Sequence, residues 1–340
     1  MGLRPGAPQR HCSARPRPDG RSAIVGARER ACLGPVAGRP LVIAHRGASA
    51  ERAEHTLAAY QVAIEQGADA LECDVRLTAD GHLVCVHDRR IDRTSDGWGV
   101  VSTKTLEDLR RHDFASWAEH DGPRPRRRPL RERRVSARRS SSWPADTPVV
   151  DASGGILTLP ILLDLVTSAG RPVGLAIETK HPTRYAGWVE EAVVAQLRNF
   201  GLASPQRAGP HPVRLMSFSA QAVRRFRTLA PGVPRVFLLE RVPLRMRGGV
   251  LPFGAGIAGV DIAILRAHPE YVGRVHQAGG RVYAWTVDEP EDVLFCRALG
   301  VSAIITNRPA LVLETLGARA GAGRGSSDPG VAGPAGPVLG

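Results

Sequence analysis

The sequence has few aromatic residues and no long apolar segment, and both shortages limit what kind of protein it encodes. Aromatic residues make up only 5% of the 340 residues, so a folded core has to rest on Val, Leu, Ile and Ala. No stretch approaches the ~20 consecutive apolar residues that a membrane-spanning helix needs. The N-terminal residues also lack the apolar segment of a secretory signal peptide. We therefore expect a cytoplasmic protein without a transmembrane segment.

The five cysteines are odd in number, and their spacing matches neither a metal-binding motif nor a disulfide framework. Cys73, Cys85 and Cys296 lie in apolar runs, so we expect them to be small buried side chains. Free cysteines are typical of a reducing compartment, which agrees with a cytoplasmic location.

The basic residues are concentrated in peripheral segments. The net charge is +13, of which residues 1–40 contribute +6, residues 120–150 another +6 and residues 317–340 the remaining +1. The rest of the chain is therefore neutral. These segments are rich in Arg, Pro, Gly and Ala and lack hydrophobic periodicity. We expect a disordered extension over 1–38, a surface insertion over about 119–154 and a disordered tail over 318–340.

Between these segments, short β-rich runs alternate with helical patterns, which predicts a parallel sheet with helices outside it. The expected parallel strands number eight, and eight strands close a (β/α)8 TIM barrel. A doubly wound open sheet is the competing fold. It would normally carry a Gly-rich phosphate loop after the first strand, whereas HRGAS at 45–49 has a single Gly. We therefore expect residues 39–317 to form one α/β barrel domain. The expected strands are 41–45, 69–76, 172–178, 212–217, 235–239, 258–261, 281–286 and 301–305.

The helical patterns follow the strands, and several of them end at a Gly. A further hairpin strand is expected at 82–88, after the turn Ala79-Asp80-Gly81. The expected helices cover 54–67, 105–112, 159–170, 187–201, 220–232, 269–280, 289–300 and 308–317.

Three acidic residues are expected at the carboxyl ends of neighbouring strands, where barrel enzymes carry their chemistry. Glu72 and Asp74 are two residues apart on one strand and so face the same side. Glu178, on the next parallel strand, adds a third carboxylate. Three converging carboxylates suit a hard divalent cation such as Mg²⁺ or Ca²⁺.

Two histidines and two cationic residues accompany these acids. His45 and His87 lie on either side of the expected metal site, and two imidazoles can act in turn as base and acid at neutral pH. Arg46 and Lys180 are the natural phosphate anchors. The structural alternative is that these two cations, together with Arg76, only form salt bridges with the acids.

Several motifs, in the same order, resemble the signature of the glycerophosphodiester phosphodiesterase family, in its bacterial cytoplasmic type. The N-terminal part contains His-Arg-Gly at 45–47, Glu-x-Asp at 72–74, Thr-x-Asp-Gly at 78–81, His-Asp at 87–88 and Asp-Arg-Thr at 92–94. IETK at 177–180 is similar to the family's second metal and phosphate motif, and AWTVD at 284–288 and GVSAIITNRP at 300–309 are similar to its C-terminal motifs. The resemblance covers about 41–117 and 157–316.

The resemblance implies a reaction and a role for each of these residues. The reaction is hydrolysis of a glycerophosphodiester to sn-glycerol 3-phosphate and an alcohol. A glycerol hydroxyl attacks phosphorus, and water then opens the cyclic phosphate. The implied residues are His45 and His87 as acid/base pair, Glu72, Asp74 and Glu178 as ligands of one Mg²⁺ or Ca²⁺, Arg46 and Lys180 at the phosphate, and Trp285, Phe218 and Glu54 around the substrate pocket.

The chain departs from the family at one motif. Where the family usually has Pro-Glu-Asn-Thr, this sequence has Ala53-Glu54-His55-Thr56. The family's Asn braces the active-site loop. The sequence does not show how His55, which stands at that position, would do so.

Two alternative functions remain open. A lysophospholipase D would use the same site with an adjacent apolar groove, which Leu244, Met246, Val250, Leu251 and Phe253 are placed to supply. Equally, these five side chains would cover the rim of the barrel. A binder of nucleic acids or acidic surfaces would use the Arg-rich segments, but these lack interleaved aromatic residues, so no specific nucleic-acid recognition is expected.

Overall fold

The computed structural model describes residues 38–119, 154–204 and 212–317 of the chain. The expected N-terminal extension, Arg-rich insertion and C-terminal tail lie outside these residues, apart from their boundary positions.

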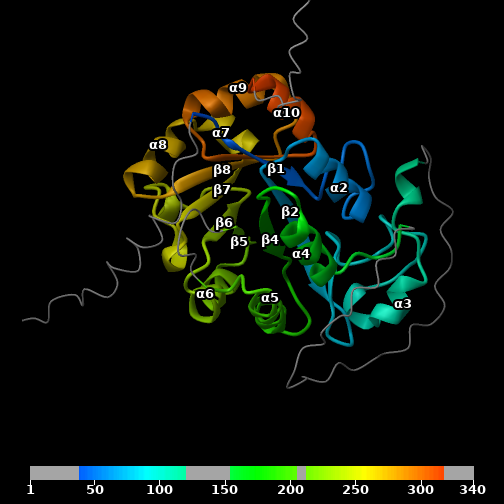
Figure 1. Ribbon diagram of the computed structural model, residues 1–340. Helices are drawn as coiled ribbons and strands as arrows, with labels where there is room; N and C mark the ends of the chain where they lie inside the picture. Colours follow the sequence, from blue (N-terminus) through cyan, green and yellow to red (C-terminus); the bar gives the residue numbers. More distant parts are fainter. Residues whose placement is uncertain (1–37, 120–153, 205–211, 318–340) are drawn as a thin grey trace, which may run out of the picture.

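The described residues form a closed barrel of eight parallel strands (Figure 1). The strand β1 closes the ring because it pairs with both β9 and β2. This closure confirms the predicted (β/α)8 fold and excludes the open sheet. The barrel strands are β1 (Leu41–His45), β2 (Ala70–Leu77), β4 (Gly174–Thr179), β5 (Val213–Ser217), β6 (Arg235–Leu239), β7 (Ile257–Asp261), β8 (Arg281–Trp285) and β9 (Ala303–Thr306).

A short hairpin extends one strand beyond the barrel, as predicted. β3 (Leu83–Cys85) pairs antiparallel with the C-terminal half of β2, with Val75 opposite Cys85. The segment that follows contains the 3₁₀ helices η1 (Val101–Thr103) and η2 (Ser116–Glu119) and the helix α3 (Leu106–Arg110). In Figure 1 it stands beside the barrel, in cyan.

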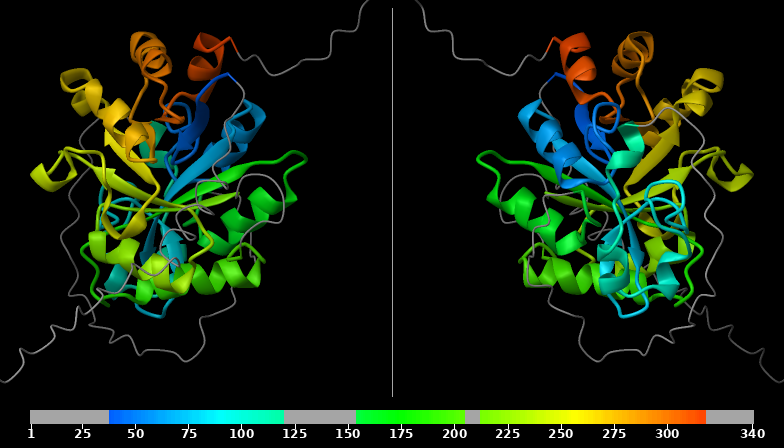
Figure 2. Two further views of the ribbon diagram at one scale, coloured as in Figure 1. Left: turned by 90° about the vertical axis from the view of Figure 1, so that its left-hand side faces the viewer. Right: turned by 90° about the vertical axis from the view of Figure 1, so that its right-hand side faces the viewer.

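The remaining helices surround the barrel, and α5 and α6 lie on the opposite side from α9 and α10 (Figure 2). Eight of the nine α-helices within the described residues match the predicted ones to within a few residues. Besides α3, the nine helices are α2 (Leu57–Glu65), α4 (Leu159–Ser168), α5 (Trp188–Asn199), α6 (Ala220–Leu229), α7 (Ile262–Ala267), α8 (Glu270–Gln277), α9 (Pro290–Leu299) and α10 (Pro309–Thr315). Of these, only α7 has no predicted counterpart.

Two helices differ from the prediction. α2 begins at Leu57 rather than at residue 54, because the Thr56 side chain accepts a hydrogen bond from Ala59 N and caps the helix there. α7 was not predicted. Its six residues follow β7 directly, with Asp261 as the capping residue, and such a length is too short for helical periodicity to be recognised.

Apolar side chains from every strand fill the interior of the barrel. The interior layer consists of Ile43, Ala70, Ala176, Met216, Val236, Leu238, Ile257, Tyr283, Ala303 and Ile305. Separate apolar clusters join the strands to the surrounding helices.

Two further expectations concern the described residues. Cys73, Cys85 and Cys296 are free and buried, as predicted. None of the helices in the described ranges is long and apolar enough to cross a membrane.

Candidate functional site

Three carboxylates meet at the mouth of the barrel. Parallel pairing of β2 with β4 sets Asp74 level with Glu178, and pairing with β1 sets Glu72 level with His45. One oxygen from each of Glu72, Asp74 and Glu178 lies within 4.8 Å of the other two, and all three residues are buried. The adjacent strands therefore bring together the acids that the sequence singled out.

The mutual repulsion of these acids changes their pKa values. Burial and the charge of Asp74 raise the pKa of Glu178 to about 8. Burial and the same neighbouring charge hold the pKa of Glu72 well above its usual value. Burial also acts to raise the pKa of Asp74, but Lys180, His55 and Arg46 outweigh it and keep this pKa well below its usual value. Two of the three acids thus lack sufficient positive charge within the protein.

This donor set fits a divalent cation. Three buried oxygen ligands within a few ångströms match the preference of Mg²⁺ and Ca²⁺, and a bound ion would supply the charge that Glu72 and Glu178 lack. The acidic cluster is therefore a candidate metal site.

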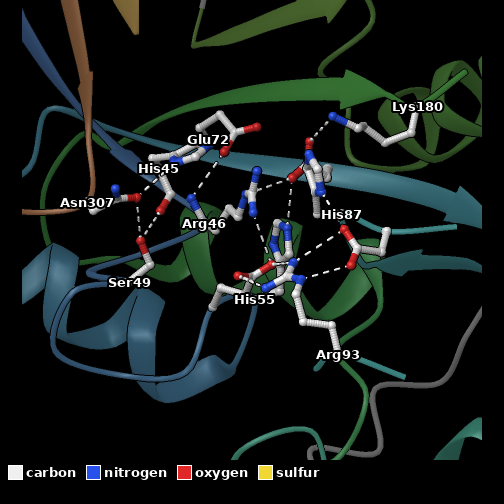
Figure 3. Close-up of polar contacts among 12 residues, drawn as sticks. His45, Arg46, Ser49, His55, Glu72, His87, Arg93, Lys180 and Asn307 are labelled. Atoms are coloured by element: carbon white, nitrogen blue, oxygen red, sulfur yellow. Dashed lines mark hydrogen bonds and ion pairs between the residues drawn. The ribbon is translucent and has the colours of Figure 1, made fainter. Parts of the chain in front are cut away.

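Arg46 and Lys180, both labelled in Figure 3, contact different carboxylate oxygens of Asp74. Arg46 Nε lies 3.0 Å from Asp74 Oδ2, and Lys180 Nζ lies 3.3 Å from Oδ1. Lys180 Nζ also lies 2.8 Å from Glu178 Oε1. The salt bridges considered for Arg46 and Lys180 are thus present, whereas Arg76 donates instead to the backbone carbonyl of His87.

His55 braces the loop between β1 and α2. Its ring nitrogens lie 3.0 Å from Asp74 Oδ2 and 2.8 Å from the Tyr60 hydroxyl, which in turn donates to the carbonyl of Glu72. The residue has a φ of +62°, in the left-handed region. Asn adopts this region more readily than other non-glycine residues, which is a physical reason for the family's Asn at this position. In this chain, His55 connects the loop to the acidic cluster.

His45 is supported by a neutral amide. Its Nδ1 lies 2.7 Å from Asn307 Oδ1, and Asn307 Nδ2 in turn donates to Asp288 Oδ2 at 2.6 Å. Since the amide oxygen only accepts, Nδ1 of His45 carries the proton and Nε2 is left with its lone pair. Burial, together with the nearby charge of Arg46, lowers the pKa of His45 to about 4.

His87 is supported by a carboxylate. Its Nδ1 lies 2.7 Å from Asp88 Oδ1, and Arg93 donates to Asp88 Oδ2 at 2.8 Å. Burial lowers the pKa of His87, while the carboxylates of Asp74 and Asp88 act in the opposite direction. The two imidazoles therefore have different electrostatic surroundings.

A pocket of about 140 Å³ opens between these side chains. Eight predicted site residues line it, namely His45, Arg46, Glu72, His87, Glu178, Lys180, Phe218 and Trp285. The Phe218 and Trp285 rings meet edge to face, with centroids 5.5 Å apart. The buried Trp285 Nε1 has no hydrogen-bond partner among the described residues.

Two predicted residues lie outside the pocket lining. Asp74 is fully buried behind it, between its ion-pair partners. Glu54, expected around the substrate, instead pairs with Arg46 at 3.1 Å and with Arg93 at 2.7 Å. Glu54 therefore connects the cation beside Asp74 to the arginine that holds Asp88.

Sequence reasoning missed several residues of the site. Asn307 and Arg93 stand in motifs that were recognised, but their hydrogen-bond partners are far away in the sequence. The remaining lining residues are Met216, Leu238, Glu240, Thr286 and Ile305, all at or near strand ends.

The five apolar residues considered for a lipid groove do not line this pocket. Met246 and Leu251 are buried in the core, and Leu244 and Val250 are exposed by 77% and 66%. None of the five therefore forms a wall of the site, and Met246, Leu251 and Phe253 instead pack in an apolar cluster between strands and helices.

Known proteins resemble this chain over most of its length. Residues 45–311 match the sequence model of the "Glycerophosphoryl diester phosphodiesterase family". A Mycobacterium tuberculosis protein named "Probable glycerophosphodiester phosphodiesterase 1" is 46% identical over 81% of this chain and 91% of its own length. A Bacillus subtilis protein named "Glycerophosphodiester phosphodiesterase" is 31% identical over 80% of this chain and 85% of its own.

Solved structures support the fold. A phosphodiesterase from Oleispira antarctica, in complex with the product sn-glycerol-3-phosphate, superposes with a TM-score of 0.61 at 23% identity, covering 82% of this chain and 97% of that one. A glycerophosphodiester phosphodiesterase from Agrobacterium tumefaciens gives a TM-score of 0.59 at 23% identity, covering 81% and 99%.

Proposed function

The chain belongs to the glycerophosphoryl diester phosphodiesterase family, and on that premise we propose that it hydrolyses glycerophosphodiesters to sn-glycerol 3-phosphate and an alcohol by metal-dependent histidine acid/base catalysis. The observation that carries this proposal is the meeting of three buried carboxylates and two imidazoles around one pocket. The product bound to the Oleispira antarctica neighbour supports the same choice of substrate.

The proposed metal ligands are Glu72, Asp74 and Glu178, with Mg²⁺ or Ca²⁺ as the ion. When bound, such an ion neutralises the phosphoryl oxygens and lowers the pKa of the attacking hydroxyl. Arg46 and Lys180, both at the pocket, are the proposed phosphate contacts, because their donors lie beside the acidic cluster.

His45 is the proposed base of the first step. Its support by Asn307 leaves Nε2 unprotonated, so Nε2 takes the proton of the glycerol hydroxyl that attacks phosphorus. The P–O bond to the alcohol then breaks, and a cyclic glycerol phosphate forms.

His87 is the proposed acid of that step. Asp88 accepts from Nδ1 and stabilises the protonated ring, so Nε2 donates its proton to the departing alcohol oxygen. In the second step His87 takes a proton from water, which attacks phosphorus, and His45 returns its proton to the glycerol oxygen. Both histidines end in their starting states.

The substrate's glycerol is proposed to lie against Trp285 and Phe218. The unpartnered indole N–H of Trp285 supplies a donor for a glycerol hydroxyl. The apolar edges of both rings suit the carbon skeleton.

Substitution of either histidine tests this mechanism. His45→Ala and His87→Ala are expected to lose at least ~10²-fold in kcat, because each removes a proton-transfer group. The measurement is release of glycerol 3-phosphate from glycerophosphocholine, with circular dichroism to check folding. His268→Ala is the matched control, since His268 is largely exposed and remote from the pocket. Near-wild-type activity of either site variant would remove the assignment.

A substrate panel separates the main proposal from its alternative. Glycerophosphocholine, glycerophosphoethanolamine and glycerophosphoglycerol are expected to be hydrolysed, each giving glycerol 3-phosphate. Lysophosphatidylcholine tests the lysophospholipase D alternative, whose candidate groove residues, Leu244 and Val250 among them, do not line the pocket.

Location and partners belong to the same proposal. We propose a cytoplasmic enzyme, which the buried free thiols of Cys73 and Cys85 support. We propose no specific nucleic-acid partner. Salt-dependent retention on DNA that disappears after deletion of residues 1–38 and 120–150 would support nucleic-acid binding as a side activity.

A further inference from the structure

A second cavity lies beside the candidate site. It has a volume of about 220 Å³ and opens between the end of β2, the helix η1 and the loop from β4 to α5. Lys180 lines both this cavity and the catalytic pocket, so the two are neighbours. The remaining lining residues are Arg76, Leu77, Arg89, Ser102, Pro182, Thr183, Arg184, Tyr185 and Val189.

The charged residues that line this cavity are all cationic. Four cationic residues line it, namely Arg76, Arg89, Lys180 and Arg184, and no acidic residue of the described ranges does. Within those ranges, Arg76, Arg89 and Arg184 form no ion pair; Nε and Nη2 of Arg76 donate to the carbonyl of His87, at 3.0 and 2.7 Å. Guanidinium groups that converge without a carboxylate favour an anion from outside.

The strand register places this cavity one step beyond the metal site. Asp74 and Glu178 are level with each other on β2 and β4. Arg76 and Lys180 each follow one of these acids by two residues, which corresponds to about 6.6 Å along a strand. Lys180 reaches back to the acidic cluster, with Nζ 2.8 Å from Glu178 Oε1, so the cavity begins directly beside the proposed metal site.

The wall of the cavity is held in place by its own contacts. The Tyr185 hydroxyl donates to Ser102 O at 2.8 Å, and Thr183 Oγ1 donates to Ala186 O at 2.7 Å. Tyr185 stacks on Trp188, with ring centroids 5.3 Å apart, and Arg184 lies 5.5 Å from the Tyr185 ring. A preformed wall lowers the cost of ordering side chains when a ligand binds.

We propose that this cavity binds a second phosphate group, carried by the alcohol moiety of the glycerophosphodiester. The inference rests on the proposed function and adds the substrate class: diesters whose released alcohol is itself phosphorylated. The planar guanidinium forks of Arg89 and Arg184 match the geometry of a phosphate, which carries more charge than a carboxylate, and Arg76 adds its positive charge while it donates to the His87 carbonyl. The second phosphate takes no part in bond cleavage.

Two diesters that differ by one phosphate test this proposal. Glycerophosphoglycerol and glycerophosphoglycerol phosphate are compared at low ionic strength with the full chain and added Mg²⁺. We expect kcat/KM to be roughly tenfold or more higher for the phosphorylated diester, as one or more charge-assisted hydrogen bonds would give. The Arg184→Ala and Arg89→Ala variants are expected to lose most of this ratio.

Arg227→Ala is the matched control, because Arg227 is exposed on α6 and lines neither cavity. It should keep the wild-type ratio. A ratio near one in the wild type, or an equal fall for both diesters in Arg184→Ala, overturns the proposal. If neither diester is hydrolysed, the proposed function fails. The cavity proposal is then tested separately, by measuring the affinity of the protein for the two diesters. The wild type must then bind the phosphorylated diester more tightly, and Arg184→Ala must lose that difference.

Discussion

At the scale of single residues, the two candidate catalytic histidines differ in what supports them. His45 hydrogen-bonds to the amide of Asn307, and His87 to the carboxylate of Asp88. A neutral amide fixes the tautomer but stabilises the protonated ring less than a carboxylate does. The assignment of base and acid in the proposed mechanism follows from this difference, which is not visible in the spacing of the motifs.

Asn307 is accordingly expected to act as a positioning residue. Asn307→Ala removes the acceptor that fixes the His45 tautomer, so kcat should fall by at least roughly tenfold while KM changes little. Steady-state kinetics on glycerophosphocholine give both constants. Asn199→Ala, at an exposed site at the end of α5, serves as the control. A change confined to KM would contradict a role in orienting His45.

At the scale of elements, the loop from β1 to α2 needs unusual backbone conformations to bring its residues to the site. Arg46 and Gly47 both have positive φ values, of 58° and 86°. A Cβ at Gly47 would lie 2.6 Å from the carbonyl carbon of Ala59 in α2. The glycine of the His-Arg-Gly motif is therefore required by the close packing of the loop on α2 as well as by its φ angle.

Gly47→Ala is expected to lower the free energy of unfolding by more than about 1 kcal/mol, because both the φ angle and the contact with Ala59 are unfavourable. Urea denaturation gives this value. Gly170→Ala is the matched control, since a Cβ there would have no neighbour within 4 Å and its φ is not in the left-handed region. Equal stabilities of the two variants would argue against the packing explanation.

The prediction of elements succeeded where each strand is a short apolar run and failed where an element is too brief to show periodicity. All eight barrel strands were predicted, as was the hairpin strand β3. The six-residue α7 was missed, and α2 was predicted to start three residues early because Thr56 caps it. Caps and single-turn helices depend on individual hydrogen bonds, which hydrophobic patterns do not report.

At the scale of the whole molecule, the barrel brings three carboxyl groups close together at its mouth. Asp74 is neutralised by Arg46 and Lys180, but Glu72 and Glu178 are left with raised pKa values by burial and by the charge of Asp74. The fold thus carries an unfavourable electrostatic energy at its mouth that a bound divalent cation would relieve.

Metal binding is therefore expected to stabilise the protein as a whole. A metal concentration of about 100 times Kd should add roughly 2.7 kcal/mol to the free energy of unfolding. Differential scanning calorimetry of chelated protein, with and without Mg²⁺ or Ca²⁺, measures the rise in Tm. Glu178→Gln should reduce that rise. The same chelation should abolish hydrolysis and readdition restore it; full activity after exhaustive chelation would exclude metal dependence.

The sequence by itself determined the class of fold and the set of candidate residues, because alternating apolar runs specify strands and helices, and because motifs mark the strand ends. Only the tertiary structure decided which of these residues contact one another. Closure of the barrel through β1 and β9 brings His45 beside Asn307, although 262 positions separate them. In the folded structure, Glu54 also forms ion pairs with Arg46 and Arg93, and four cationic residues line a second cavity. Such contacts depend on distances between elements, and a linear pattern of residue types does not contain those distances.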